Sequence, residues 1–169
     1  GTLWSEKPMY VQADFIFRKW TAKITADPSL AADQPIKALA EGDRAWLGSI
    51  LDHVPELLRG LGVAFGGITT AAFEAEVRYF FDIARHPTLG LAYTDVGYRP
   101  MLDLLAYLEA NAFQIYICTG GGRDFVRVVG EDMYGIPRDR VIGSGPTLEY
   151  RDGDIYRTMG VEQPIDDGP

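Results

Sequence analysis

Apolar side chains recur at steps of three and four residues along the first half of the chain, which is the spacing of one face of an α-helix. The first such set is Tyr10, Ala13, Phe17, Trp20 and Ile24. Pro8 can start this helix and Asp27-Pro28 can end it, because proline is tolerated in a first helical turn but not inside a helix. The pattern therefore predicts an amphipathic helix between these prolines.

Two further stretches repeat the helical spacing. One follows Asp43, a good N-cap residue, and runs until Pro55 interrupts it, with a short continuation that ends at Gly62. The other follows Thr70, a second N-cap candidate, and runs to His86-Pro87. Residues 9–86 are thus predicted to form several amphipathic helices and no strand. We interpret their apolar faces as core packing rather than as a cofactor site or a membrane face.

The pattern changes after Tyr98. Pro100 is predicted to begin a helix that Asn111 ends. The next segment, "FQIYIC" at residues 113–118, is apolar almost throughout. Such a run is typical of a strand that is buried on both faces, as in the centre of a parallel sheet covered by helices. We therefore predict a central strand at residues 113–118.

Helix and strand continue to alternate toward the end of the chain. A helix is predicted from Phe125 to Met133, and "RVIGS" reads as a short strand. The pair Asp152-Gly153 lies between two β-prone runs and predicts a hairpin. The predicted fold class is α/β, with a doubly wound, Rossmann-like parallel sheet formed by residues 1–8 and 97–169 and an all-helical region formed by residues 9–96.

The composition fits a globular protein. A length of 169 residues, with 47% hydrophobic and 24% charged residues, suits one domain or a core that carries one large insertion. The run "LLRGLGVAFGGI" is interrupted by Arg59 and by glycines, so no membrane-spanning helix is predicted. The chain opens on "GTLW" and stops on "DDGP", and both ends are interpreted as cut. The compartment is left open, with the cytoplasm favoured over the periplasm or secretion.

The net charge and the few potential metal-ligating residues limit which kinds of ligand the chain can bind. The net charge of -8 argues against a nucleic-acid partner, whereas a small phosphorylated substrate needs only a few local donors. Cys118 is the only cysteine, which excludes an internal disulfide and a cysteine-based zinc site. His53 and His86 lack acidic or cysteine partners at ligand spacing, so surface or capping roles are favoured. No metal ligand is predicted in this chain, and the oligomeric state is not predicted.

A glycine-rich segment is the main candidate site. The stretch "IYICTGGGRDFVR", residues 115–127, changes from apolar to glycine to charged. Ligands of α/β sheets gather at the carboxyl ends of strands, where the next helix presents unpaired N–H groups. The Thr119 hydroxyl and the N–H groups of Gly120 and Gly121 could therefore hold a phosphate oxygen. In the alternative interpretation, Thr119 only caps the helix after an ordinary turn.

Other glycine and cysteine motifs do not fit this segment. The dinucleotide pattern G-x-G-x-x-G fails because Phe125 stands at the third glycine, and no Walker lysine follows. A cysteine-dependent phosphatase loop, similar to H-C-x-x-x-x-x-R, would use Cys118 as a thiolate. Here Ile117 replaces the histidine and Arg123 falls one residue short. The thiol is also predicted to be buried in the strand and inert.

The order of these pieces resembles the haloacid dehalogenase superfamily of phosphohydrolases, and most closely its phosphoserine-phosphatase-like branch with a helical cap. That family begins with a strand that delivers D-x-D-G-T-L, of which Gly1, Thr2 and Leu3 match the last part. Thr119 matches the second motif, a Ser or Thr that hydrogen-bonds the transferring phosphoryl group. Three longer runs look like bacterial members: "EKPMYVQ", "YRPMLDLLAYLEANAFQIYICTGGGRDFVR" and "YGIPRDRVIGS".

The resemblance implies a magnesium-dependent phosphomonoesterase that acts through an aspartyl-phosphate. It places the attacking and the acid-base aspartates before Gly1, and the lysine and the magnesium-binding acids after "DDGP". The 169-residue chain as written is therefore expected to be inactive. Residues 9–96 would be the cap that closes over the active site and selects the substrate. Asp166 and Asp167 lie before the expected lysine, and we interpret them as a solvated turn.

The resemblance also implies roles for single residues. Thr119 would be the one catalytic side chain in this chain, and phosphate would contact Thr2, Thr119, Gly120 and Gly121. Glu6 is a candidate contact to a substrate amine, although it lies one residue from that branch's pattern. Arg123 either contacts substrate or faces solvent, and solvent is favoured. The alternative function is a non-catalytic binding or interaction protein on a degenerate phosphohydrolase fold.

Overall fold

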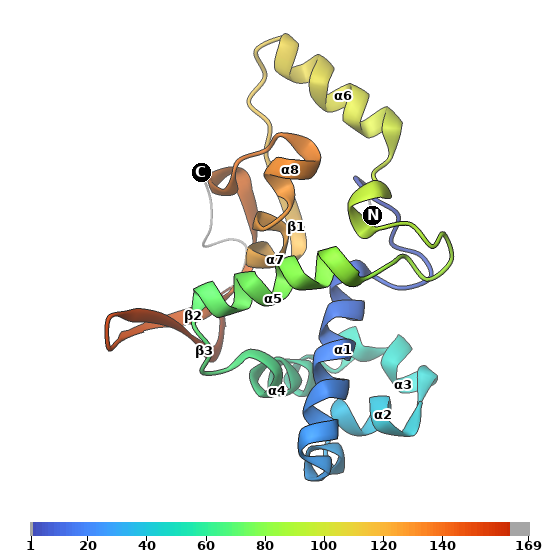
Figure 1. The fold of residues 1–169 in the computed structure, drawn as a ribbon, viewed down its shortest axis with the longest axis vertical. Helices are drawn as coiled ribbons and strands as arrows, with labels where there is room; N and C mark the ends of the chain where they lie inside the picture. Colours follow the sequence, from blue (N-terminus) through green and yellow to red (C-terminus); the bar gives the residue numbers. More distant parts are fainter. Residues whose placement is uncertain (1, 163–169) are drawn as a thin grey trace. The chain divides into compact units, whose positions relative to one another are not determined.

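The structure, a computed structural model, describes residues 2–162, with side chains up to residue 158. Eight α-helices occur among these residues: α1 (Val11–Ala26), α2 (Ile36–Glu41), α3 (Arg44–Gly48), α4 (Val54–Phe65), α5 (Thr70–Ile83), α6 (Arg99–Ala110), α7 (Arg123–Arg127) and α8 (Gly130–Tyr134) (Figure 1). Three strands occur in the same range: β1 (Ile117–Gly122), β2 (Val141–Arg151) and β3 (Asp154–Glu162). Four short 3-10 helices are η1 (Pro28–Ala32), η2 (Ile50–Asp52), η3 (Tyr93–Asp95) and η4 (Arg138–Arg140).

The described chain forms two compact units. Unit 1 consists of residues 2–12, 74–145 and 162, and it contains α6, α7, α8 and β1. Unit 2 consists of residues 13–73 and 146–161, and it contains α2, α3 and α4. The predicted cap at residues 9–96 stays a prediction, because a cap is defined by its placement over an active site.

Local signals placed several helix ends correctly, but two predicted helices were wrong in extent. The helix expected to run from Asp43 to Pro55 ends at Gly48, and the single helix expected from Phe125 to Met133 is divided into α7 and α8. Helix α1 lies between the two prolines that were expected to bound it. The Asp43 carboxylate accepts the Trp46 N–H at 3.0 Å and caps α3, and Asn111 caps the C-terminus of α6. Helix α5 begins at Thr70, but its capping side chain is Thr69, whose hydroxyl accepts the Ala72 N–H at 3.1 Å. The N-cap prediction at Thr70 was therefore wrong by one residue.

The predicted doubly wound parallel sheet is wrong. The sheet has three strands in the order β1-β2-β3, with β1 and β2 parallel. Strands β2 and β3 form the hairpin that the sequence predicted, since Asp152 and Gly153 between them have φ values of 53° and 87°. Helices make up most of the remaining described chain. The sequence pattern recognised a strand before the glycines but could not reveal how few strands would pair with it.

The prediction of a central strand at residues 113–118 is also wrong. Strand β1 begins only at Ile117, and it lies at the edge of the three-stranded sheet. Phe113 is 62% exposed and Tyr116 is 37% exposed, so this apolar run is not covered on both faces. Figure 1 shows the segment between α6 and β1 as an extended connection. An edge position leaves one side of a strand without a neighbour, which the apolar composition alone did not indicate.

Aromatic rings form the core of unit 1. Phe125 of α7 packs against Phe81 and Phe80 of α5, with ring centroids 5.2 and 6.1 Å apart. Phe81 stacks on Trp4 at 6.1 Å, and Phe80 stacks on Tyr93 at 5.5 Å. This cluster fixes the start of α7 against α5 immediately after the glycine-rich segment.

A second aromatic core lies in unit 2. Phe15, Phe65 and Phe73 are in mutual ring contact at centroid distances of 5.3 to 5.9 Å. Trp20 is fully buried, and its indole N–H donates to the Gly60 carbonyl oxygen at 2.8 Å. A methyl group added at Gly60 would lie 2.5 Å from both the Trp20 ring and the Pro35 ring. Glycine is therefore required at this position of α4 by the close approach of two rings.

Gly60→Ala is expected to destabilise the protein by about 1–3 kcal/mol, the usual cost of overpacking a dense core. The matched control is Gly48→Ala, because a methyl group at Gly48 would meet no atom within 4 Å. Urea unfolding followed by circular dichroism measures both variants. Equal midpoints for Gly60→Ala and the wild type would contradict the proposed close packing.

Candidate functional site

The candidate site is the segment Thr119–Arg123, here called the TGGGR segment. It covers the last residues of β1 and the first residue of α7. Strand β1 pairs with β2 in the register Ile117 to Val141 and Thr119 to Gly143, and an irregularity between Thr119 and Gly122 precedes the pairing of Gly122 with Ser144. Thr119 was expected at the end of its strand, but it lies within β1.

Two glycines of β2 allow the TGGGR segment to approach closely. A methyl group at Gly143 would lie 2.6 Å from Cγ2 of Thr119, and one at Gly145 would lie 2.8 Å from the Arg123 guanidinium. Both glycines are buried and point to the same face of β2, because residues two apart share a face. Neither glycine was predicted to take part in the site. The signal in the sequence was the spacing within "VIGSG", because two glycines two residues apart in a strand leave one face of it without side chains.

Side chains already occupy two amide donors of the segment. The Gly121 N–H donates to the Thr119 hydroxyl oxygen at 3.1 Å. The Gly122 N–H donates to Oε1 of Gln12 at 2.9 Å. Gln12 is the second residue of α1 and was not predicted. It lies 110 residues away in the chain, so no local pattern in the sequence could have indicated this contact.

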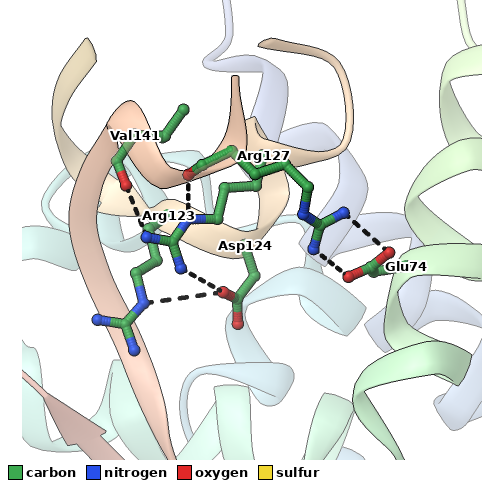
Figure 2. Close-up of polar contacts among 6 residues, drawn as sticks. Glu74, Arg123, Asp124, Arg127 and Val141 are labelled. Carbon is green, nitrogen blue, oxygen red and sulfur yellow. Dashed lines mark hydrogen bonds and ion pairs between the residues drawn. The ribbon is translucent and has the colours of Figure 1, made fainter. Parts of the chain in front are cut away.

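Arg123 is held in a cluster of ionic contacts (Figure 2). Its side chain is only 12% exposed, so the expectation that it faces solvent was wrong. Figure 2 shows the guanidinium groups of Arg123 and Arg127 both directed at the Asp124 carboxylate. The nitrogen-to-oxygen distances are 3.8 and 3.9 Å. Arg123 has its side chain against β2 because Gly145 leaves room for the guanidinium. Whether substrate contacts it stays a prediction.

The same cluster ties α7 to the start of β2. Arg127 donates to the carbonyl oxygens of Arg138 and Val141, each at 2.9 Å. Arg138 forms a two-point ion pair with Glu74 of α5, and this hydrogen bond raises the pKa of Arg138. Three guanidinium groups thus face two carboxylates.

The other predicted phosphate and substrate contacts, Thr2 and Glu6, also belong to unit 1. Thr2 is exposed and outside any helix or strand. Glu6 accepts the Trp4 indole N–H at 3.0 Å. Burial, and secondarily the charge of Glu6, raise the pKa of Tyr134. The structure thus brings together Thr119, Gly120, Gly121 and Arg123, whereas the roles of Thr2 and Glu6 stay predictions.

The two histidines have structural contacts. His86 is buried, and its Nδ1 accepts the N–H groups of Thr88 and Leu89 at 3.2 Å, which leaves Nε2 to donate to the Ser5 hydroxyl at 3.3 Å. His53 stacks on Trp46 at 4.9 Å. Within residues 2–162, no group of three or more His, Cys, Asp and Glu side chains could hold a metal ion. Asp166 and Asp167 lie outside the described residues.

Cys118 is exposed, so the prediction of a buried thiol was wrong. Side chains alternate along a strand, and Ile117 takes the buried face of β1. Because the Cys118 thiol is exposed, burial does not exclude it as a thiolate nucleophile, and mutation of Cys118 is needed to test that alternative.

No protein-family model matches the chain, and no curated protein is significantly similar to it. Across residues 2–162, every helix is too short or too polar to cross a membrane.

Proposed function

We propose that the TGGGR segment binds the phosphoryl group of a small phosphate ester. The observation that carries this proposal is the grouping of polar groups on one segment: the Thr119 hydroxyl, which accepts the Gly121 N–H at 3.1 Å, the Gly122 N–H, which donates to Gln12, and Arg123. Backbone amides, a hydroxyl and a guanidinium are the donors that phosphoryl oxygens need. Together with the resemblance to haloacid dehalogenase-like phosphohydrolases, they support a phosphomonoester hydrolase that acts through an aspartyl-phosphate.

Each residue of the segment would have a separate role. The Thr119 oxygen accepts the Gly121 N–H, so its hydroxyl hydrogen remains available to donate to one phosphoryl oxygen. Glycine at position 120, where an added methyl group would meet no atom within 4 Å, lets a ligand approach the backbone. The guanidinium of Arg123, beside Asp124 and supported by Arg127 and Arg138, would offset the ligand's negative charge.

The described residues do not fit a magnesium ion. The nearest acidic side chain in sequence, Asp124, already faces the guanidinium groups of Arg123 and Arg127. A magnesium ion at that carboxylate would be a third cation and would be repelled by both guanidinium groups. We therefore derive no step through magnesium from these residues. The resemblance places the magnesium-binding acids after "DDGP" and the nucleophile before Gly1, and that part of the proposal rests on the resemblance.

Titration of the 169-residue chain with inorganic phosphate tests the binding proposal. Phosphate is expected to shift the 15N-1H resonances of Gly120, Gly121 and Gly122 in a saturable way, whereas chloride at equal ionic strength is not. Thr119→Ala should weaken phosphate binding by about tenfold or more, the range for losing one hydrogen bond to a charged group. Thr94→Ala is the control, because Thr94 is exposed on η3 of the same unit.

Uniform small shifts over the surface, or equal affinities for the wild type and Thr119→Ala, would contradict the proposed site. If the protein is a non-catalytic binding protein instead, phosphate is expected to bind in the same way. The two functions are separated by turnover of a phosphomonoester by the protein expressed from its complete open reading frame.

A further inference from the structure

Gln12 lies across the backbone of the candidate site. Its Oε1 accepts the Gly122 N–H at 2.9 Å. A methyl group added at Gly121 would lie 2.6 Å from Oε1 of Gln12, and one added at Gly122 would lie 2.6 Å from Nε2. The carboxamide therefore covers two consecutive glycines, and a side chain at either position would have to displace it.

The start of α1 places Gln12 at this point. Val11, the residue before it, is buried, whereas the Gln12 side chain is partly exposed. Gln12 also belongs to the same compact unit as the TGGGR segment. The backbone of Gln12 is thus anchored by its neighbour, while the side chain can exchange its hydrogen bond with a ligand at modest cost.

The Gln12 carboxamide oxygen makes the same kind of hydrogen bond that an oxygen of an anion would make. A carboxamide oxygen is an acceptor with partial negative charge, and here it receives a backbone N–H beside a hydroxyl and a cluster of guanidinium groups. A phosphoryl oxygen would receive the same N–H and would carry a larger negative charge. Gln12 Oε1 therefore holds a position that an oxygen of the ligand would take to receive the Gly122 N–H.

We propose that Gln12 determines the anion affinity of the TGGGR segment, because its Oε1 accepts the Gly122 N–H until a phosphoryl oxygen replaces it. The inference rests on the proposed phosphate-binding function and adds a residue that competes with the ligand. Binding would exchange one hydrogen bond for another and would form no covalent bond. The affinity measured for the wild type then includes the cost of displacing the carboxamide.

The test compares phosphate titrations of the wild type with Gln12→Ala, Gln12→Glu and Gln114→Ala, each followed by 15N-1H spectra. Gln12→Ala should bind inorganic phosphate about three- to tenfold more tightly, since one neutral hydrogen bond no longer has to be broken. Gln12→Glu should bind at least about tenfold more weakly, because a carboxylate accepts more strongly and repels the anion. Gln114→Ala removes an exposed glutamine and should match the wild type.

Spectra without phosphate give a second readout. The Gly122 amide proton should exchange with water faster in Gln12→Ala than in the wild type, because its acceptor is gone. Dispersed spectra of each variant also show that it is folded. Unchanged exchange at Gly122, or phosphate affinity that is equal or weaker in Gln12→Ala, would overturn the inference.

The outcomes separate this inference from the proposed function. Phosphate binding that depends on Thr119 but not on Gln12 would leave the function standing and overturn the inference alone. Tighter binding by Gln12→Ala that is insensitive to Thr119→Ala in the same chain would support Gln12 and contradict the role of Thr119. Shifts at none of the three glycines in either the wild type or Gln12→Ala would overturn both.

Discussion

Phe125→Ala is expected to lower the free energy of unfolding by about 3–5 kcal/mol, the range for removing a large ring from a well-packed core. Phe125 has no exposed surface, and its ring contacts Phe80 and Phe81 of α5. These rings in turn contact Tyr93 and Trp4, so a cavity at Phe125 would open in the middle of the cluster. The start of α7, which follows the TGGGR segment directly, would lose its anchor.

Phe113→Ala is the matched control for this prediction. It deletes the same atoms, but Phe113 is 62% exposed, and such surface substitutions usually change stability by less than about 0.5 kcal/mol. Urea unfolding followed by circular dichroism and tryptophan fluorescence compares the two variants with the wild type. A similar shift in the midpoint for both variants would show that the cluster around Phe125 is not a packed core.

Several helix ends could be predicted because their signals are local. The apolar spacing before Ala26, the carboxylate of Asp43 and the amide of Asn111 each act within one or two turns of the chain. The hairpin at Asp152-Gly153 is equally local, since its positive φ values belong to the turn residues themselves. Such features depend little on what the rest of the protein does, and a sequence pattern records them directly.

The sheet could not be predicted in the same way. The run at residues 113–118 is apolar enough for a central strand, but a strand is central only if other strands pair on both sides. Within residues 2–162, β1 pairs only with β2, and Phe113 and Tyr116 keep much of their surface exposed. Composition specifies which residues tolerate burial, whereas strand order depends on pairings distant in sequence.

The candidate site shows the same division. Thr119, Gly120 and Gly121 are contiguous, so a motif could point to them. Gly143 and Gly145 lie against the segment because β2 pairs with β1. Gln12 reaches it through a hydrogen bond between residues that are 110 positions apart in the chain. The orientation of Arg123 also depended on a distant residue, because Gly145 provides the space into which its guanidinium fits. Sequence reasoning therefore identified the donors of the segment but not what surrounds them.

Thr119→Ala is expected to lower kcat by roughly ten- to a thousandfold in the protein expressed from its complete open reading frame, assayed with p-nitrophenyl phosphate and magnesium. The hydrogen bond from the Thr119 hydroxyl should tighten as charge builds on the phosphoryl oxygen, so its loss should appear mainly in kcat rather than in KM. Thr119→Ser keeps the hydroxyl and should retain most of the activity. A loss of similar size in Thr119→Ser would indicate a packing role against Gly143 instead.

Cys118→Ser, one residue upstream, tests the thiolate alternative in the same assay. Because Cys118 is exposed, replacing its sulfur with oxygen should cost little stability, and any inactivation would reflect chemistry rather than misfolding. The phosphoryl-binding role of Thr119 requires Cys118→Ser to remain active while Thr119→Ala is impaired. The reverse pattern, with Cys118→Ser inactive and Thr119→Ala near the wild-type rate, would contradict the role of Thr119 and make the thiolate the better candidate for the nucleophile.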